Sequence, residues 1–152
     1  MAYTKADQLT SVALAVFRLN GLLLDWGDAF GRVHRLTSAR WQMLGALALA
    51  ARPLSAPQIA YTMGVTRQGA QKQLHLLVRE ALVEVRQNPM HKRSPLYTLT
   101  AQGQRVYGEI DKRWRQHVER LSKDFSASDL AVASRVLAAL ADTHAILPEP
   151  TL

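Results

Sequence analysis

The sequence predicts a mainly α-helical fold with a small β-hairpin, in which long N- and C-terminal helices flank a helix-turn-helix lobe. Three observations lead to this prediction. Apolar residues recur at helical spacing in the first and last parts of the chain. A capping box and a tight turn at Gly64 join two short helices in the middle. Two short segments with strand patterning follow those helices, separated by a polar loop.

The N-terminal helix is expected over 4–30, from Thr4 to the vicinity of Gly31. Its apolar residues follow spacings of three, four and seven that define one helix face: Leu9, Val12, Ala13, Val16, Leu19, Leu23 and Phe30. Leu22 and Leu24 widen this apolar surface beyond the single stripe of an ordinary surface helix. The surplus predicts that a second copy of the chain covers it, so that the protein is a homodimer.

Three shorter helices are expected over 37–51, 55–64 and 66–80. Each begins at a residue whose side chain can accept from free backbone N–H groups: Thr37 or Ser38, then Ser55 with Gln58 as a capping box, then Thr66. Gly64 makes the tight turn between the second and the third of these helices. Helical periodicity places four residues of the third one at the core: Ala70, Leu74, Leu77 and Ala81.

Two strands are expected over 82–85 and 96–99, and together they form a hairpin. Thr100 caps a helix that runs from 101 to about 121, and Ser126 or Ser128 begins a last helix that continues through Ile146. We expect residues 1–152 to form a single domain. In it, dimerisation helices over 4–30 and 101–147 flank a lobe over 37–100.

The composition excludes several classes of site. The chain has no cysteine, which rules out disulfides, thiolate metal sites and thiol-based redox switches. No histidine has a second histidine or a cysteine at ligand spacing, so we expect no metal site. We find no phosphate-binding glycine loop, nucleophile elbow or paired carboxylates, and therefore expect neither an enzyme nor a cofactor.

The N-terminal residues lack a basic leader, and the apolar stretch over 12–17 is soon broken by Arg18. No segment approaches the roughly 18 continuous apolar residues of a membrane span. We therefore expect a cytoplasmic protein with no membrane partner.

Positive charge is concentrated in the middle of the chain. Residues 32–115 contain 14 Lys or Arg against four acids, a balance of +10, whereas the remainder carries −3. A basic segment between mildly acidic ends is typical of a protein that approaches a phosphate backbone through one region.

The helix over 66–80 turns a polar row away from its core side: Gln68, Gln71, Lys72, His75 and Arg79. The row has no acid before Glu80, and its side chains can bond to base edges or phosphates in a major groove. We expect the bases to be contacted by Gln68, Gln71 and Lys72. Thr66 and Arg67 lie at the helix N-terminus, where free N–H groups favour phosphate. An ordinary solvated helix face would show the same pattern.

The loop between the two strands supports the nucleic-acid interpretation. This segment has cations and no acid: Arg86, His91, Lys92 and Arg93. They lie where a β-hairpin wing could enter a minor groove, and Arg93 is our candidate for insertion.

Four segments, taken in order, resemble landmarks of the MarR family of bacterial transcription regulators: Leu36-Thr37-Ser38-Ala39-Arg40-Trp41, Ser55-Ala56-Pro57-Gln58-Ile59-Ala60, Val65-Thr66-Arg67-Gln68 and Leu99-Thr100-Ala101-Gln102-Gly103. The resemblance implies a winged helix-turn-helix lobe and a dimer formed by the terminal helices. It also implies that two copies of the 66–80 helix enter successive major grooves of a pseudo-palindromic operator, about 34–36 Å apart.

The sequence departs from the family pattern at two places. The family commonly has an Asp two residues before the wing Arg, where this chain has His91. A contact that orders the wing is therefore expected to be absent. The family also commonly ends its recognition helix with Gly, where this chain has Ala81, so we expect a different turn into the first wing strand.

In this family a small aromatic or anionic effector often binds between the dimer helices and the DNA-binding lobe. The resemblance implies a candidate effector pocket near Trp26, Phe30, His34, Arg40, Trp41 and Met43. Aromatic and Met side chains at helical spacing are more often core than ligand contacts. The alternatives to operator binding are a helical protein-interaction module and an RNA-binding module.

Overall fold

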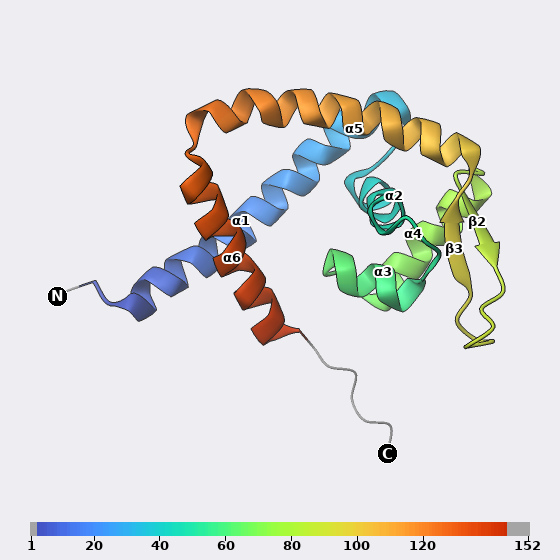
Figure 1. Cartoon of the computed structure of the whole chain (residues 1–152), viewed down its shortest axis with the longest axis horizontal. Coiled ribbons are helices and arrows are strands. Elements are labelled where there is room, and N and C mark those ends of the chain that lie inside the picture. Colours follow the sequence, from blue (N-terminus) through green and yellow to red (C-terminus); the bar gives the residue numbers. More distant parts are fainter. Residues whose placement is uncertain (1–2, 146–152) are drawn as a thin grey trace, which may run out of the picture. The chain divides into compact units, whose positions relative to one another are not determined.

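The computed structural model describes residues 3–145 and is mainly helical, with a small antiparallel sheet (Figure 1), which confirms the predicted fold class. Its elements, in chain order, are α1 Lys5–Gly31, η1 Arg32–His34, α2 Ser38–Ala50, β1 Leu54–Ser55, α3 Ala56–Met63, α4 Arg67–Arg79, β2 Val83–Arg86, β3 Leu96–Leu99, α5 Ala101–Leu121, η2 Ser122–Asp124 and α6 Ala127–His144.

The chain forms two compact units, Met1–Asp111 and Lys112–Leu152. The boundary between them falls within the continuous helix α5. The single domain expected over 1–152 stays a prediction. The last helix ends at His144, and Ile146, expected in it, lies outside the described residues.

The expected N-terminal caps are confirmed, because each rests on a local hydrogen bond. Thr37 rather than Ser38 caps α2, and its Oγ1 accepts from the Arg40 N–H at 3.2 Å. The other caps accept in the same way, with full capping boxes at Ser55 with Gln58 and at Thr4 with Asp7. The sequence analysis missed the second of these boxes. Hydrogen bonds from the Thr4 side chain and backbone hold the pKa of the Asp7 carboxyl below its ordinary value.

Helices α3 and α4 both end in a left-handed residue. Gly64 has φ of 65° after α3, and Ala81 has φ of 58° after α4 although it carries a side chain. The Ala81 N–H donates to Val78 O, and the Leu82 N–H to Leu77 O, both at 3.0 Å, which is the Schellman pattern. The alanine thus makes the turn that a glycine would make, and the different turn expected into the first wing strand is not found.

The sheet has three strands in the order β1-β3-β2, all antiparallel. Strands β2 and β3 form the expected hairpin, with Val85 opposite Tyr97. Strand β1 was not predicted, because a strand of two residues has no readable alternation. Its Leu54 also lies opposite Tyr97, so Tyr97 is at the centre of the sheet and is buried.

The core of the first unit surrounds α2, which packs against α1, α3, α4 and β3 (Figure 1). Its side chains include Leu44, Ile59, Leu74 and Leu77, all fully buried. Ala70 is buried as expected, but the prediction that Ala81 joins the core is wrong. Helix α4 ends at Arg79, and the left-handed turn at Ala81 takes that residue out of the helical phase and leaves it exposed.

Helix α1 exposes many large apolar side chains: Leu9, Leu14, Val16, Phe17, Leu19, Leu22, Leu23 and Leu24. By length and composition alone the segment Lys5–His34 could cross a membrane, and none of its most apolar stretch is buried. We did not expect this, because charged residues such as Arg18 interrupt every long apolar run. One such helix near an N-terminus is weak evidence for a membrane span.

The second unit contains the end of α5, η2 and α6. Ser126, one of the two expected caps, begins α6 by accepting from the Asp129 N–H at 3.0 Å. Helix α6 also leaves apolar side chains exposed: Leu130, Val132 and Leu137.

Candidate nucleic-acid interface

The outward face of α4 is polar and free of acids, as the sequence predicts. The side chains at Ala70, Leu74 and Leu77 are buried, which fixes the rotation of the helix about its axis. The opposite face is exposed and carries the whole predicted row, which we name the recognition row: Gln68, Gln71, Lys72, His75 and Arg79. These five residues, with Leu76, line a shallow open groove.

The N-terminus of α4 can receive an anion. Thr66 Oγ1 accepts from the Gly69 N–H at 3.0 Å, and no acid lies in the first turn. The Thr66 hydroxyl can still donate its own proton, because capping uses only an oxygen lone pair. Arg67 is exposed beside it. Backbone N–H groups, a hydroxyl and a guanidinium thus gather where a phosphate oxygen is favoured.

The wing loop is ordered by Asn88, which the sequence analysis did not single out. Asn88 Nδ2 donates to Ser94 O at 2.8 Å, and Asn88 Oδ1 accepts from the Met90 N–H at 3.1 Å. The signal available was the tendency of Asn to form turns with its own backbone. Within residues 3–145 no carboxylate pairs with Arg93. Hydrogen bonds of the Asn88 side chain, rather than an acid contact to Arg93, thus order the loop.

The wing cations differ in how they are paired. His91, Lys92 and Arg93 are exposed. They belong to the loop that joins β2 and β3 (Figure 1). Arg86 lies on β2 and pairs with Glu84 at 2.9 Å. Hydrogen bonds from Arg86 and then from the Thr98 hydroxyl lower the pKa of the Glu84 carboxyl. Part of the Arg86 charge is thus neutralised within the sheet.

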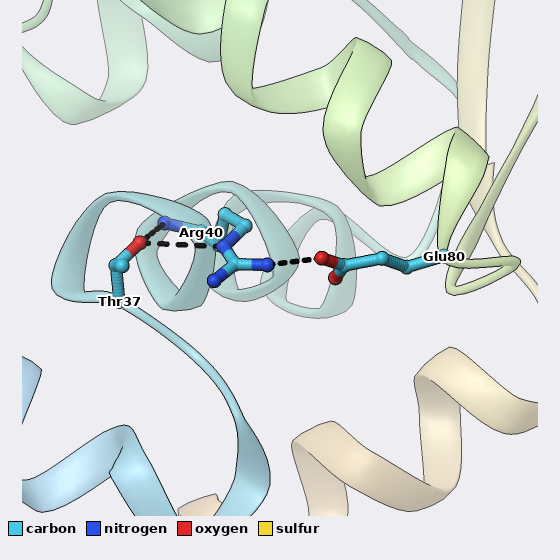
Figure 2. A network of polar contacts seen from close by, with 3 residues as sticks. All are labelled: Thr37, Arg40 and Glu80. Atoms are coloured by element: carbon cyan, nitrogen blue, oxygen red, sulfur yellow. Dashed lines mark hydrogen bonds and ion pairs between the residues drawn. The ribbon is translucent and has the colours of Figure 1, made fainter.

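Arg40 links the start of α2 to the end of α4 (Figure 2). Its guanidinium pairs with the carboxylate of Glu80, the C-cap residue of α4. Its Nε donates to Thr37 Oγ1 at 3.4 Å. The first acid after the recognition row is therefore paired with a cation. Sequence reasoning could not find this contact, because 40 residues separate the partners.

Three residues of the candidate effector pocket form an aromatic stack. The ring centroids of Trp26 and Phe30 lie 4.6 Å apart, and those of Phe30 and Trp41 lie 5.4 Å apart. Phe30 and Trp41 pack against the hydrophobic core, and Met43 is a fully buried member of it.

The other two residues of that group make polar contacts. His34 Nδ1 lies 3.4 Å from Glu109 Oε2, and its buried Nε2 has no hydrogen-bond partner among residues 3–145. The Arg40 guanidinium reaches toward α4, where it pairs with Glu80 (Figure 2). The structure therefore gathers the three rings and holds Arg40 separately.

A groove of about 580 Å³ lies between α1, α2 and α4. Its lining is Leu24, Asp28, Thr37, Ser38, Ala39, Arg40, Lys72, Gln73 and Leu76. Arg40 is the only residue of the predicted effector set in this lining, and Lys72 also belongs to the recognition row. Among the described residues no group of His, Asp or Glu could hold a metal ion.

We compared the chain with known protein families and solved structures. The sequence model of the MarR family matches residues 35–94, which contain α2, the helix-turn-helix and most of the wing. A crystal structure of the MarR family transcription regulator SP03579 is 26% identical, with a TM-score of 0.74 over 91% of each chain. The chain belongs to the MarR family. The resemblance inferred from the four ordered segments is thereby confirmed.

Further comparisons agree with this assignment. The uncharacterized proteins Rv2011c of Mycobacterium tuberculosis and Mb2034c of Mycobacterium bovis are each 41% identical over 108 residues, which cover 71% of this chain and 74% of the relative. A mutant MarR from Escherichia coli complexed with operator DNA shares the fold, at 19% identity and a TM-score of 0.72, over 90% of this chain and 98% of that one. MarR-family regulators typically bind DNA, respond to ligands and are generally non-enzymatic.

Proposed function

We propose that this MarR-family protein is a sequence-specific, double-stranded-DNA-binding repressor that acts as a homodimer on a pseudo-palindromic operator. The observation that carries the proposal is the exposed, acid-free polar face of α4, held outward by three fully buried residues on the opposite side. It is cytoplasmic in this proposal, as MarR-family regulators typically are, and needs no cofactor.

Contacts to DNA divide into three kinds. Gln68, Gln71 and Lys72, the first three residues of the row, face base edges, since amide and ammonium groups read the major groove. Phosphates are contacted by Thr66, Arg67, His75, Arg79 and Arg86. The wing places His91, Lys92 and Arg93 at the minor groove, with Arg93 inserted.

The homodimer is supported by the uncovered apolar side chains of α1 and α6. Exposures of 77% for Phe17 and 63% for Leu14 are far above what a buried helix face shows. Exposed large apolar side chains in this number on a single helix, as on α1, mark an interaction site. The proposal predicts a dimer in sedimentation at micromolar concentration, and a stable monomer would contradict it.

We also propose release by a small anionic effector in the groove between α1, α2 and α4. Lys72 lines it and supplies positive charge beside the Arg40 guanidinium that pairs with Glu80, and Leu24 and Leu76 supply apolar contacts. An anion held by Lys72 there would compete with DNA for the same ammonium group. Related structures were solved with ligands: PcaV from Streptomyces coelicolor with its natural ligand, and NadR with 4-hydroxyphenylacetate.

The decisive experiment is the selection of bound duplexes from a random pool. The proposal predicts a two-fold symmetric site whose half-sites are about one helical turn apart. Retention should fall steeply between about 50 and 200 mM salt and should be competed poorly by single-stranded RNA. Enrichment of an asymmetric site would contradict the homodimer, and efficient competition by RNA would favour an RNA-binding module. No enrichment at all would favour a helical protein-interaction module.

A further inference from the structure

Helix α1 crosses α2 at an unusually close contact formed by Gly27, Asp28 and Ser38. Gly27 is buried, and a Cβ built on it would overlap Ser38 Oγ and lie 3.3 Å from Ser38 Cβ. The Ser38 side chain is 5% exposed, and its hydroxyl donates to Leu24 O at 3.0 Å. The Ser38 N–H donates to Asp28 Oδ1 at 2.6 Å. Only glycine at 27 permits this arrangement.

The same turn of α2 also holds the recognition helix. Ser38 contacts α1, and Arg40, two residues later, pairs with Glu80 at the C-cap of α4 (Figure 2). Helix α2 packs against both α1 and α4. A continuous chain of specific contacts therefore runs from α1 through the start of α2 to the end of α4.

We propose that the contact of Gly27, Asp28 and Ser38 positions the recognition helix relative to the dimerisation helix, and thereby sets the distance between the two recognition helices of the dimer. This inference rests on the homodimer of the proposed function. Because the two subunits are related by symmetry, any displacement at the contact acts twice on that distance. Gly27, Asp28 and Ser38 are thus positioning residues that determine the half-site spacing the protein accepts.

Gly27→Ala is the direct test. The added methyl would overlap Ser38 Oγ, and relieving that overlap should push α1 and α2 apart by roughly 1 Å. The distance between the two α4 helices should then shift by roughly 2 Å, which exceeds half of the 3.4 Å rise per base pair. Gly21→Ala is the matched control, since it makes the same change in the same helix with nothing within 4 Å of the added carbon.

The rescue variant transfers the glycine to the other helix. In Gly27→Ala/Ser38→Gly the new methyl faces a backbone Cα at 3.8 Å, which is an ordinary contact. The double variant should restore the wild-type distance. Ser38→Ala adds no bulk and should fold, but it loses the hydroxyl bond to Leu24, so its distance distribution should broaden.

The lack of cysteine allows single labels to be placed without removing native thiols. A nitroxide on Gln68→Cys reports the distance between the two α4 helices by pulsed electron paramagnetic resonance. A chain labelled at both Arg18→Cys and Gln68→Cys, diluted with unlabelled chain, reports the α1-to-α4 distance within one subunit. Circular dichroism and sedimentation confirm that each variant folds and assembles.

We expect Gly27→Ala to change both distances, and Gly21→Ala to change neither. An unchanged intrachain distance in Gly27→Ala, or an equal change in Gly21→Ala, would overturn the proposal. If Gly27→Ala fails to fold, an unaltered distribution in Ser38→Ala would overturn it instead. An intrachain change without any signal between subunits would support the contact as a positioning element and refute the homodimer of the proposed function.

Discussion

Replacing Ala81 by glycine should stabilise the protein, because Ala81 occupies a backbone conformation that favours glycine. The residue has φ of 58° at the end of α4. Its N–H and that of Leu82 close the Schellman turn into β2. It is exposed, so a change of side chain there removes no core contact. Only backbone energetics distinguish the two residues at this position.

The magnitude follows from two opposing terms. A residue with a Cβ in the left-handed region costs about 1–2 kcal/mol relative to glycine. Glycine in turn makes the unfolded chain more flexible, which costs about 0.4–1 kcal/mol. The difference favours Ala81→Gly by about 0.5–1 kcal/mol. For a chain of this size that corresponds to a rise of roughly 1–4 °C in Tm.

Two alanine-to-glycine variants provide controls in the same chain. Ala51 has φ of 52° at the end of α2, so Ala51→Gly should stabilise by a similar amount. Ala29 is exposed and lies in the last turn of α1, with no left-handed backbone for glycine to relieve, so Ala29→Gly should destabilise by about 0.5–1 kcal/mol. Thermal and urea unfolding should be compared at one protomer concentration, because the proposed dimerisation would add to apparent stability. A lower Tm for Ala81→Gly would refute the reasoning.

Three further predictions concern the interface and the core. Lys72 adds a positive charge near the DNA backbone besides its proposed base contact, so Lys72→Ala should weaken binding to all duplexes and reduce the salt slope by about one, whereas the uncharged Gln71→Ala should relax discrimination at one position of each half-site. Equal losses on operator and random DNA for Gln71→Ala, measured by fluorescence anisotropy, would contradict that assignment. Arg40→Ala should lower the free energy of unfolding by about 0.5–1 kcal/mol, and a double-mutant cycle with Glu80→Ala should show coupling of that size. A coupling near zero would mean that the ion pair does not hold α4. Burial raises the pKa of the Tyr97 phenol, so the stability it contributes is complete below pH of about 10 and is lost as pH rises through the raised pKa. Tyr97→Phe should therefore lose less stability than the wild type between pH 8 and 11 in urea unfolding, and parallel losses would refute this.

The helices and the recognition row could be predicted because their signals are local. Caps such as Ser55 and Thr66 satisfy N–H groups three residues away, so the pairing is visible in the sequence itself. The row on α4 follows from helical periodicity once Leu74 and Leu77 are assigned to the core. Periodicity fails where the helix ends, which is why Ala81 was misplaced.

The contacts that were missed depend on the tertiary fold. Strand β1 exists because Leu54 pairs with Tyr97 of β3. A segment of two residues carries no sequence signal that could predict this distant partner. The pairing of Arg40 with Glu80 likewise requires α2 and α4 to be packed together. The same holds for the candidate effector residues: the sequence grouped Arg40 with the aromatic stack, whereas packing directs it toward the groove that Lys72 lines.

A membrane span and a dimerisation helix would both have the apolar composition of α1. The contacts made by the second half of α1 distinguish these two possibilities. Gly27 is buried against Ser38, and Asp28 accepts from the Ser38 N–H, so this part of α1 is fixed to the lobe. The remaining segment from Lys5 to Leu24 is barely as long as the roughly 20 residues a bilayer requires, and it contains Arg18. An arginine near the centre of a span costs about 2.5–3.5 kcal/mol on insertion scales. A second subunit imposes no such cost, because Arg18 can lie at the edge of the interface while the leucines around it are covered.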